Sequence, residues 1–431
     1  MMDTSLAQVT PLTQHIGEGK STPNLSQYQH AGGYEGLKKA VQQDCSEVLE
    51  EIKKSNLRGR GGAGFPTGLK WSFVPSGDNA PKTKFVVCNA DEMEPGTFKD
   101  RMLMEGDPHQ LIEGMIIAAY TIQASVGYVF LRFEYTESER QLQQAIDDCK
   151  KNNLLGKNIL GSGFDFELYV HTSAGRYICG EETALLNSLE GRRANPRAKP
   201  PFPQVAGLWG KPTIVNNVET FCNIPHIIRH GAEWFQGLGI GDDAGTKIYG
   251  VSGRANKPGS WELPMGTPVR ELIEKHGGGM QDGYQLKGFL PGGGSTDFLV
   301  EAHLDLAMEY DVIGKAGSRM GTGQLILLDD KTCPVGMTLN LIRFFAQESC
   351  GWCTPCRDGL PQIQHFLEKL EAGQGCAEDI SILDKFTRYL APGNTFCALA
   401  PGAVEPLQSA LKYFREDFDN HIHQQCCPYS N

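Results

Sequence analysis

The sequence lacks a long hydrophobic run, a basic tract and an N-terminal targeting segment. Its most apolar stretch, residues 115–131, is interrupted by Gln123, Ser125 and Gly127, which predicts a buried helix followed by a strand rather than a membrane span. The net charge of −11 argues against a nucleic-acid-binding surface. Because no basic residue precedes Lys20, we expect neither a signal peptide nor a transit peptide, and therefore a cytoplasmic protein.

Cysteine, by contrast, is not scarce, since the chain has 13 of them. Structural disulfides are rare in the cytoplasm, so cysteines at motif spacing predict metal ligands or redox groups. Cys88, Cys149, Cys179 and Cys222 lie in apolar or helical surroundings, and we expect them to be ordinary buried thiols.

The strongest motif is SCGWCTPCR, at residues 349–357, which places Cys350, Cys353 and Cys356 at C-x₂-C-x₂-C spacing. Pro355 disfavours helical backbone at the residue before it, so we expect a loop that turns its sulfurs toward one centre. With a distant fourth cysteine, this spacing is typical of a [4Fe–4S] site. Zinc is the alternative, although zinc sites usually use paired C-x-x-C knuckles or histidine partners.

The fourth cluster ligand has five candidates, namely Cys333, Cys376, Cys397, Cys426 and Cys427. We favour Cys397, because it lies in a turn with Gly393 and Pro401, between two helical segments. Cys376, in another interhelical loop, is the second choice. Cys426 and Cys427 lie in a polar tail that we expect to be mobile.

Four apolar stripes with spacings of three and four residues surround these cysteines. They predict helices within residues 339–346, 363–370, 383–390 and 404–418. Four short helices favour a small bundle, with the cluster between the loop after the first helix and the loop after the third.

A glycine-rich stretch, LRGRGGAGFPTGLKW, occupies residues 57–71. Gly59, Gly61 and Gly64 satisfy G-x-G-x-x-G, but the residues before them have helical rather than strand spacing. The stretch is therefore not the usual Rossmann fingerprint, and it lacks the Gly-Lys-Ser/Thr of a Walker A loop.

The composition of this stretch still predicts an anion site. Its glycines let backbone amides approach a phosphate, flavin or nucleotide, and Arg58, Arg60 and Lys70 add positive charge. Phe65 and Phe73 are candidates for stacking on an aromatic ring, with simple packing as the alternative.

Polar residues follow the next predicted strand, residues 85–88. They are Asn89, Asp91, Glu92 and Glu94. Since α/β proteins place ligand contacts at the carboxyl ends of strands, we expect ribose or ring contacts here. The alternative is a solvated loop before a helix that starts at Pro95.

Two further stretches have the same character. A strand-like YIC, residues 177–179, meets Gly180 and a helix whose first turn holds Glu181 and Glu182, where the alternative role is helix capping. Another strand ends at Asn216 and Asn217, and Phe202 lies in a basic, proline-rich loop.

Taken together and in order, six motifs resemble those of the flavin-bearing, NADH-oxidising subunit of respiratory complex I. They are GRGGAGFPTGLKW, NADEMEPGTF, RYICGEETAL, GRRANPRAKPPFP, NNVET and ESCGWCTPCRDG. The resemblance implies an α/β protein in three parts. Residues 1–240 would form a Rossmann-like FMN-binding domain, residues 241–332 a β-grasp domain of the soluble-ligand-binding type, and residues 333–420 the four-helix bundle with the cluster. Residues 421–431 would be a tail.

The resemblance also implies site residues. The FMN site would comprise Gly59, Arg60, Gly61, Gly62, Lys70, Asn89, Asp91, Glu92, Tyr177, Gly180, Glu181, Glu182, Val215, Asn216, Asn217 and Thr220. NADH would contact Phe65, Lys70, Phe73, Glu92, Glu94, Glu182 and Phe202. The cluster ligands would be Cys350, Cys353, Cys356 and Cys397.

No side chain need act as a nucleophile, because a flavin accepts a hydride and passes on single electrons. We expect Glu92, Glu94 and Glu182 to form an acidic wall, with Glu94 repelling the 2′-phosphate of NADPH. In the middle part we expect a strand at residues 247–251 and a helix at 269–276. The run at 291–294 could be a ligand loop, although the resemblance implies a structural one.

The implied partners are a thioredoxin-fold [2Fe–2S] subunit and a large multi-cluster subunit, on the cytoplasmic side of a bacterial inner membrane. The chain would meet the membrane only through that complex, and it would bind no nucleic acid. One alternative is the diaphorase subunit of an NAD-linked hydrogenase or formate dehydrogenase. A second is a β-grasp scaffold whose metal is purely structural.

Overall fold

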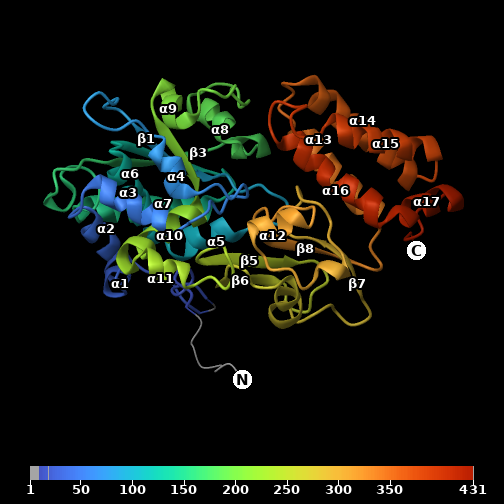
Figure 1. Ribbon diagram of the computed structural model, residues 1–431, viewed down its shortest axis with the longest axis horizontal. Coiled ribbons are helices and arrows are strands. Elements are labelled where there is room, and N and C mark those ends of the chain that lie inside the picture. The colour runs from blue at the N-terminus through green and yellow to red at the C-terminus, as the bar shows by residue number, and fades with distance from the viewer. Residues whose placement is uncertain (1–8, 18, 431) are drawn as a thin grey trace.

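A computed structural model describes residues 9–17 and 19–430 of the chain. Residues 1–8, the first part of the segment in which we expect no targeting signal, lie outside the described residues. Figure 1 shows an N-terminal α/β part, a second sheet and a group of C-terminal helices in red. Across the described ranges, no helix combines the length and the apolar composition that a bilayer span would need.

The first sheet has four parallel strands in the order β3-β2-β1-β4. Its strands are β1 (Phe85–Ala90), β2 (Val126–Leu131), β3 (Glu167–Thr172) and β4 (Thr213–Asn217). Side chains alternate between the two faces of a strand. Val86 and Cys88 of β1 therefore join the core beneath the long helices, whereas Phe85 and Val87 join the core shared with the C-terminal helices. The second face of this sheet is thus covered by a distant part of the chain.

In the N-terminal part, the described residues form eleven α-helices. They are α1 (Leu25–His30), α2 (Glu35–Ala40), α3 (Cys45–Lys54), α4 (Thr67–Ser72), α5 (Lys99–Gly106), α6 (Pro108–Ile122), α7 (Thr136–Lys151), α8 (Glu182–Leu189), α9 (Pro203–Ala206), α10 (Val218–His230) and α11 (Ala232–Gln236). The expected helix and strand within residues 115–131 are confirmed as the end of α6 and β2. All four cysteines assigned to packing are buried.

Two local predictions in this part are wrong. Tyr177–Gly180 is a 3-10 helix rather than the end of a strand, because it forms a tight turn that leads directly into α8. The helix after the acidic loop begins at Lys99 instead of Pro95, since residues 94–97 form a turn closed by the Thr97 amide on the Glu94 carbonyl.

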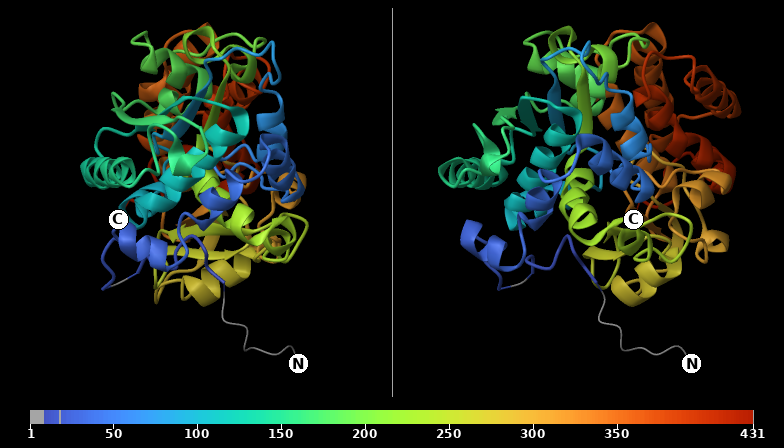
Figure 2. Two further views of the ribbon diagram at one scale, coloured as in Figure 1. Left: turned by 90° about the vertical axis from the view of Figure 1, so that its left-hand side faces the viewer. Right: turned by 60° about the vertical axis from the view of Figure 1, so that its left-hand side comes forward.

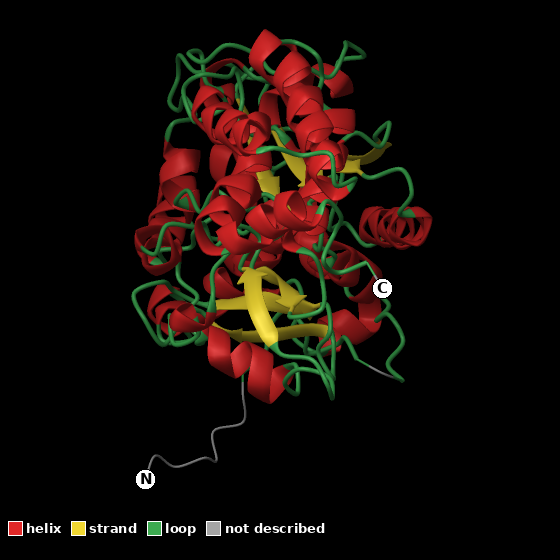
Figure 3. Cartoon of the chain, turned by 90° about the vertical axis from the view of Figure 1, so that its right-hand side faces the viewer, coloured by secondary structure: helices red, strands yellow, loops and turns green. Residues whose placement is uncertain are grey.

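The second sheet has the order β6-β5-β8-β7, with β5 and β8 parallel and the outer pairs antiparallel. Its strands are β5 (Thr246–Ser252), β6 (Gly259–Pro264), β7 (Leu286–Leu290) and β8 (Gln324–Asp329). A π-helical turn, Glu271–His276, and α12 (Tyr310–Lys315) accompany it. The predicted strand at residues 247–251 and helix at 269–276 are therefore confirmed. Figure 3 shows the strands of the two sheets as separate groups with helices between them.

The C-terminal part has five helices where we expected four. They are α13 (Pro334–Glu348), α14 (Thr354–Glu371), α15 (Ala377–Tyr389), α16 (Leu399–Tyr413) and α17 (Arg415–Gln424). The last apolar stripe is split, because the chain leaves helical geometry at Phe414 before α17 begins. Figures 1 and 2 show these helices (red) packed beside the first sheet.

Two predictions about this part need correction. Thr354 is helical despite Pro355, because a proline in the first turn of a helix removes only an amide that would have no intrahelical partner. The chain beyond residue 420 is also not an unstructured tail. It continues α17 to Gln424, and the Cys427 side chain is buried.

A buried charge cluster joins the N-terminal part to the second sheet. The Glu219 carboxylate, at the start of α10, lies 2.9 Å from the Lys99 ammonium and 3.1 Å from that of Lys247 in β5. Glu219 also accepts the amide of Ile248 at 2.9 Å. All three charged side chains are fully buried, and the two lysines hold the pKa of Glu219 down at about 2. Lys99 also pairs with the buried Asp100 carboxylate at 2.7 Å, so Glu219 and Asp100 together compensate the two buried lysines.

Replacing Glu219 with glutamine should destabilise the protein severely. The variant leaves Lys99 and Lys247 buried without their shared anion, and breaking a buried charge pair costs about 3–5 kcal/mol. Thermal and denaturant unfolding of the wild type and Glu219→Gln would measure this loss. Glu233→Gln, on the exposed surface of α11, is the matched control and should change stability by less than about 0.5 kcal/mol. Equal stability of the two variants would contradict the assigned role of Glu219.

Candidate functional site

A cavity of about 360 Å³ lies where the three parts of the chain meet. Its lining comes from the glycine-rich loop, the carboxyl end of β1, the 3-10 turn before α8, the second-sheet part and the loop before α16. The lining residues are Gly61, Gly62, Ala63, Asn89, Asp91, Glu92, Met93, Glu94, Thr97, Asp100, Tyr177, Ile178, Gly180, Glu181, Asn217, Gly292, Ser295, Arg319, Gly321, Thr322, Cys397, Ala398 and Leu399. This volume is in the range of cofactor sites.

The glycine-rich loop forms one wall of the cavity, and its shape requires glycine. Gly62 and Gly64 have φ of +127° and +65°, backbone angles that residues with a side chain rarely adopt. A Cβ on Gly64 would lie 2.5 Å from the Tyr310 ring, whose hydroxyl donates to the Gly59 carbonyl at 2.7 Å. The loop is thus held by the second-sheet part, while Gly61 and Gly62 line the cavity.

Asp91 is a buried carboxylate that makes no close hydrogen bond, although the Ser173 hydroxyl and the Arg132 guanidinium are near enough to act against the rise in its pKa. Its side chain is 5% exposed, and neither carboxylate oxygen has a hydrogen-bond partner among the residues that the structure describes. Burial raises the pKa of Asp91 to about 7. A ligand group that donates a hydrogen bond into the cavity would satisfy this carboxylate and favour its charged form.

Glu92 and Glu94 also line the cavity, but their oxygens are already engaged. Glu92 accepts the amides of Asp100 and Arg101 at the start of α5, and burial raises its pKa to about 7. Glu94 accepts the Tyr177 hydroxyl and the Ser295 amide, both at 2.7 Å, and burial raises its pKa as well. The two carboxylates therefore also shape the wall.

Three further predicted residues tie neighbouring turns together at the cavity. Asn89 donates its amide to the Gly180 carbonyl at 2.9 Å. Asn217 donates to the Asp100 carboxylate at 2.6 Å. Glu181 caps α8 by accepting the amides of Thr183 and Ala184, so the capping role and a place at the cavity coexist.

Several predicted site residues support the wall from behind. The Arg60 backbone amide donates to the Thr220 hydroxyl. The buried Arg60 guanidinium points toward the second sheet, where it donates to the carbonyls of Ala244 and Thr246. The Trp71 indole donates to Asn216 at 2.9 Å. We expected the Arg60 side chain to add positive charge at the anion site. This prediction is wrong, because its hydrogen bonds connect the glycine-rich loop to the second sheet instead.

Lys70 bridges two other predicted residues. Its ammonium lies 2.9 Å from the Glu182 carboxylate and 2.7 Å from the Val215 carbonyl at the end of β4. Lys199 approaches the same carboxylate at 2.8 Å, and the two lysines lower the pKa of Glu182. This ion cluster stands beside the glycine-rich loop.

The three predicted stacking rings lie at the protein surface. Phe65, Phe73 and Phe202 are 47%, 51% and 54% exposed. The rings of Phe65 and Phe73 have centroids 6.4 Å apart and are inclined at 48°, so they form a tilted pair that offers one aromatic surface to solvent.

Residues 291–322 contribute more to the cavity than we predicted from the sequence. Gly292, Ser295, Arg319, Gly321 and Thr322 all line it. Of the two roles that we considered for the loop at 291–294, the structural one holds, since the loop positions Glu94, and the loop also forms part of the wall. Its three consecutive glycines were the available signal. A Cβ on Gly293 would lie 2.6 Å from the Glu94 side chain.

The cysteine motif and Cys397 come together at one end of the C-terminal helices. Burial and the neighbouring Cys350 and Cys356 raise the pKa of Cys397 to about 12. The rings of Trp352 and Phe396, from the two loops, meet edge to face at 6.2 Å. Because Cys397 and the two residues after it also line the cavity, a ligand there would lie next to the four thiols.

Cys333 and Cys376, two other candidates for the fourth ligand, lie at the opposite end. Cys333 precedes α13 and Cys350 follows it, and 15 helical residues separate them by roughly 22 Å. Cys356 lies in the first turn of α14 and Cys376 follows that helix, and the 15 residues from Cys356 to the end of α14 span roughly 22 Å. The helix lengths therefore leave Cys397 as the natural partner of the three-cysteine motif.

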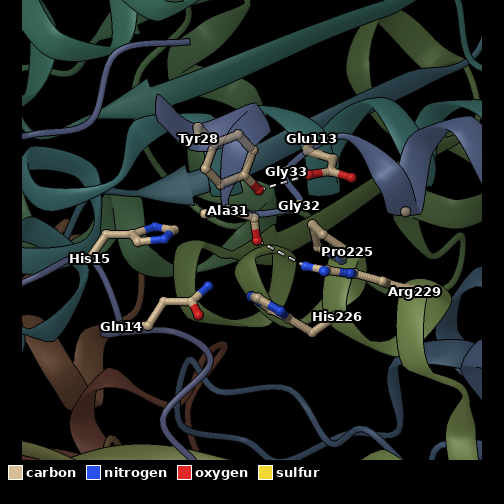
Figure 4. Close-up of a pocket in the computed structure, with 11 residues that line it drawn as sticks. Gln14, His15, Tyr28, Ala31, Gly32, Gly33, Glu113, Pro225, His226 and Arg229 are labelled. Atoms are coloured by element: carbon tan, nitrogen blue, oxygen red, sulfur yellow. Dashed lines mark hydrogen bonds between the residues drawn. The ribbon is translucent and has the colours of Figure 1, made fainter. Parts of the chain in front are cut away.

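A second, much smaller cavity of about 10 Å³ lies beside α6 and α10. Figure 4 shows the Tyr28 hydroxyl pointing to Glu113, with Arg229 bonded to the Ala31 carbonyl. Glu113 also accepts the amides of Tyr34 and Leu37. A space of this size holds about one water, so it is part of the framework.

Comparisons with known proteins agree with this arrangement. Residues 52–226 match a family described as "Nuo51 FMN-binding domain", residues 248–298 match "SLBB domain", and residues 336–421 match "NADH-ubiquinone oxidoreductase-F iron-sulfur binding region". The chain is 57% identical to the F subunit of the NADH-quinone oxidoreductase of Salmonella typhimurium and equally to that of Escherichia coli, over 98% of this chain and 94% of each relative. It is 50% identical to an F subunit of Rhizobium meliloti, over 94% of this chain and 96% of that one.

A solved structure shares the fold. An NAD⁺-reducing [NiFe]-hydrogenase in the H₂-reduced state contains a chain that is 32% identical, with a TM-score of 0.82, and the match covers 95% of this chain and 68% of that chain.

Fold and site thus define a flavin-binding and iron–sulfur-binding α/β protein. Within that class, the chain belongs to the family of NADH-quinone oxidoreductase F subunits. The expected cofactors, FMN and a [4Fe–4S] cluster, are confirmed. The chain's own residues fit them, because the cavity offers glycine amides and the Asp91 carboxylate, and it is lined by Cys397, which has Cys350 and Cys356 as neighbours.

The raised pKa of Asp91 makes a prediction about the FMN-free chain. Asp91 in the folded state has a pKa of about 7, above its ordinary value of 3.8, so the folded chain binds the proton more tightly. The contribution of Asp91 to stability should increase by about 1.4 kcal/mol in total as pH falls from 8 to 6, because the proton is bound as pH falls through the folded pKa. Asp91→Asn should be more stable than the wild type at pH 8 and depend less on pH, measured by thermal unfolding.

The exposed Asp78→Asn is the control for this experiment, and it should keep the wild-type pH dependence. A pH dependence that is identical in wild type and Asp91→Asn would contradict the assignment.

Proposed function

We propose that this chain is the NADH-oxidising subunit of an NADH-quinone oxidoreductase, and that it passes electrons from FMN to its [4Fe–4S] cluster. Bound FMN would supply the conversion between a hydride and single electrons. The observation that carries the proposal is the single cavity bounded both by the glycine-rich loop and by Cys397–Leu399. A flavin in that cavity lies next to the cluster ligands, as electron transfer between them requires.

We assign FMN binding to the residues that line the cavity from the first sheet and the glycine-rich loop. The amides of Gly61 and Gly62 would contact its polar groups, and Asp91 would accept a hydrogen bond from it. Gly180 leaves room beside the ligand, since a Cβ there would meet no atom within 4 Å. The backbone and hydroxyl supports of Arg60, Asn216 and Thr220 would keep this wall rigid.

NADH would enter from the side of the exposed aromatic residues. Phe65, Phe73 and Phe202 would flank the adenine, while Glu94 and Glu182 would set specificity through their charge. Lys70 and Lys199 neutralise Glu182, so Glu94 is the acid whose charge is available to repel a 2′-phosphate. The Tyr177 hydroxyl and the Ser295 amide hold Glu94 in position for this role.

The chain works with other subunits of its complex. We propose that these include a thioredoxin-fold [2Fe–2S] subunit and a large multi-cluster subunit, and that the assembly lies on the cytoplasmic side of the inner membrane. The relatives that match nearly their full length are F subunits, whereas the hydrogenase chain extends well beyond the matched part. The diaphorase alternative is therefore not favoured, and neither is a scaffold without a flavin.

Replacing Cys397 with serine should separate the oxidation of NADH by the flavin from the transfer of electrons to the cluster. Loss of one ligand should abolish the paramagnetic resonance signal of the reduced cluster and electron delivery to quinone. NADH should still bleach the bound flavin, because the cavity remains. Cys376→Ser, at the other end of α15, is the matched control and should retain both activities. If Cys397→Ser kept a wild-type cluster signal, the proposed ligand set would be wrong.

Glu94→Gln tests nucleotide specificity. Glutamine keeps an acceptor for the Ser295 amide but removes the charge, so the NADPH/NADH ratio of kcat/KM should rise roughly tenfold, which corresponds to about 1.4 kcal/mol. Glu139→Gln, on the exposed face of α7, should leave the ratio unchanged. An unchanged ratio in Glu94→Gln would refute the repulsive role.

A further inference from the structure

A second group of metal-ligating side chains lies at the end of the C-terminal helices opposite the iron–sulfur motif. Cys333, Glu371, His421 and Cys427 each direct one ligand atom toward a common centre, and these four atoms lie within 4.8 Å of one another. They come from the residue before α13, the last residue of α14, the middle of α17 and the segment after α17. Four separate points of the chain thus converge.

The distances suit one metal ion. The Cys333 sulfur lies 3.0 Å from Glu371 Oε1 and 3.5 Å from His421 Nε2, and that nitrogen lies 3.1 Å from the same oxygen. Donors at the corners of a tetrahedral zinc site, with bonds of about 2.0–2.3 Å, stand roughly 3.3–3.8 Å apart. Small side-chain movements would bring all four donors to that spacing.

The surroundings orient two of these donors. His421 Nδ1 is 2.7 Å from the Asp417 carbonyl, and donation from Nδ1 leaves the Nε2 lone pair directed at the centre. The Gly336 amide, in the first turn of α13, donates to the Cys333 sulfur at 3.2 Å, which favours a thiolate there. His421 is fully buried, and Cys427 is 7% exposed.

The segment that carries Cys427 is held closely against the helices. A Cβ on Gly373, in the loop after α14, would lie only 1.9 Å from the Gln425 carbonyl oxygen, so the chain crosses that loop at backbone contact. Beyond Cys427, the Tyr429 hydroxyl bonds to Asp417 of α17 and to Lys287 of β7. Cys427 is therefore placed from both sides.

We propose that Cys333, Glu371, His421 and Cys427 form a structural zinc site that fastens α17 and the C-terminal segment to the ends of α13 and α14. Two thiolates, an imidazole and a carboxylate form a ligand set that suits zinc. Binding releases the two thiol protons, and four protein ligands leave no open position for catalysis. Through Lys287 and Asp417, the site also fixes the C-terminal helices against the second sheet.

Metal analysis of the purified, FMN-loaded and cluster-loaded chain tests this proposal. Zinc and iron are measured by mass spectrometry of the elements after removal of loosely bound metal. The wild type should hold about one zinc per chain beyond its cluster iron, and chelator competition should show tight binding of added Zn²⁺. Cys427→Ser and Cys333→Ser should weaken Zn²⁺ binding by at least about tenfold, because even outer-shell changes cost that much.

Cys426→Ser is the matched control, since Cys426 is the exposed neighbour of Cys427. It should retain wild-type zinc binding. Iron content and NADH bleaching of the flavin should be unchanged in all three variants, which would show that they fold. Equal Zn²⁺ binding by wild type and Cys427→Ser would overturn the proposal. So would a Cys333–Cys427 disulfide in the wild type, detected as a loss of two hydrogen masses.

Discussion

The buried Glu219 carboxylate is the interaction on which the arrangement of the cavity depends. It stands at the start of α10, two residues after Asn217, and it binds Lys99 in α5 and Lys247 in β5. Asn217 and Asp100 both line the cavity and are bonded to each other. A single anion in the interior thus fixes β4, α5 and the second sheet relative to one another. Burying such a charge costs free energy, and the ion pairs and hydrogen bonds of Glu219 offset this cost.

The cavity is formed by the packing of all three parts of the chain and not by one part alone. The glycine-rich loop is held by Tyr310, Glu94 is held by Ser295, and the 3-10 turn at Tyr177 is held by Glu348 at the end of α13, whose carboxylate accepts the Tyr177 amide at 2.8 Å. Each wall from the first sheet is therefore supported by a later part of the chain. A similar contact between distant residues positions the loop of the cysteine motif, since the Arg193 guanidinium donates to the Cys350 carbonyl. The packing of the three parts therefore also sets the distance between the two cofactor sites.

Much of this could be predicted from the sequence, because the patterns involved are local. The strands at residues 85–88 and 247–251, the helical stripes and the C-x₂-C-x₂-C spacing each follow from neighbouring residues. The choice of Cys397 over Cys376 also followed from local turn signals, and helix lengths now give it a geometric reason. The resemblance supplied the cofactors and the order of the parts.

What could not be predicted depends on contacts between distant residues. Nothing near Arg60 in the sequence shows that its guanidinium is directed to the Ala244 and Thr246 carbonyls rather than into the cavity. The contribution of Arg319 depends on how the second sheet docks, and the burial of Cys427 depends on the close passage over Gly373. Pro355 was misleading because its effect depends on its position within the helix, which the sequence alone did not fix.

The most direct test of the central claim is an anaerobic titration of the purified protein with NADH, followed by visible absorbance and electron paramagnetic resonance. If the flavin and the cluster share one cavity wall, bleaching of the flavin should be accompanied by the signal of a reduced [4Fe–4S] cluster in the same titration. Bleaching with an intact but unreduced cluster would contradict the proposed relay.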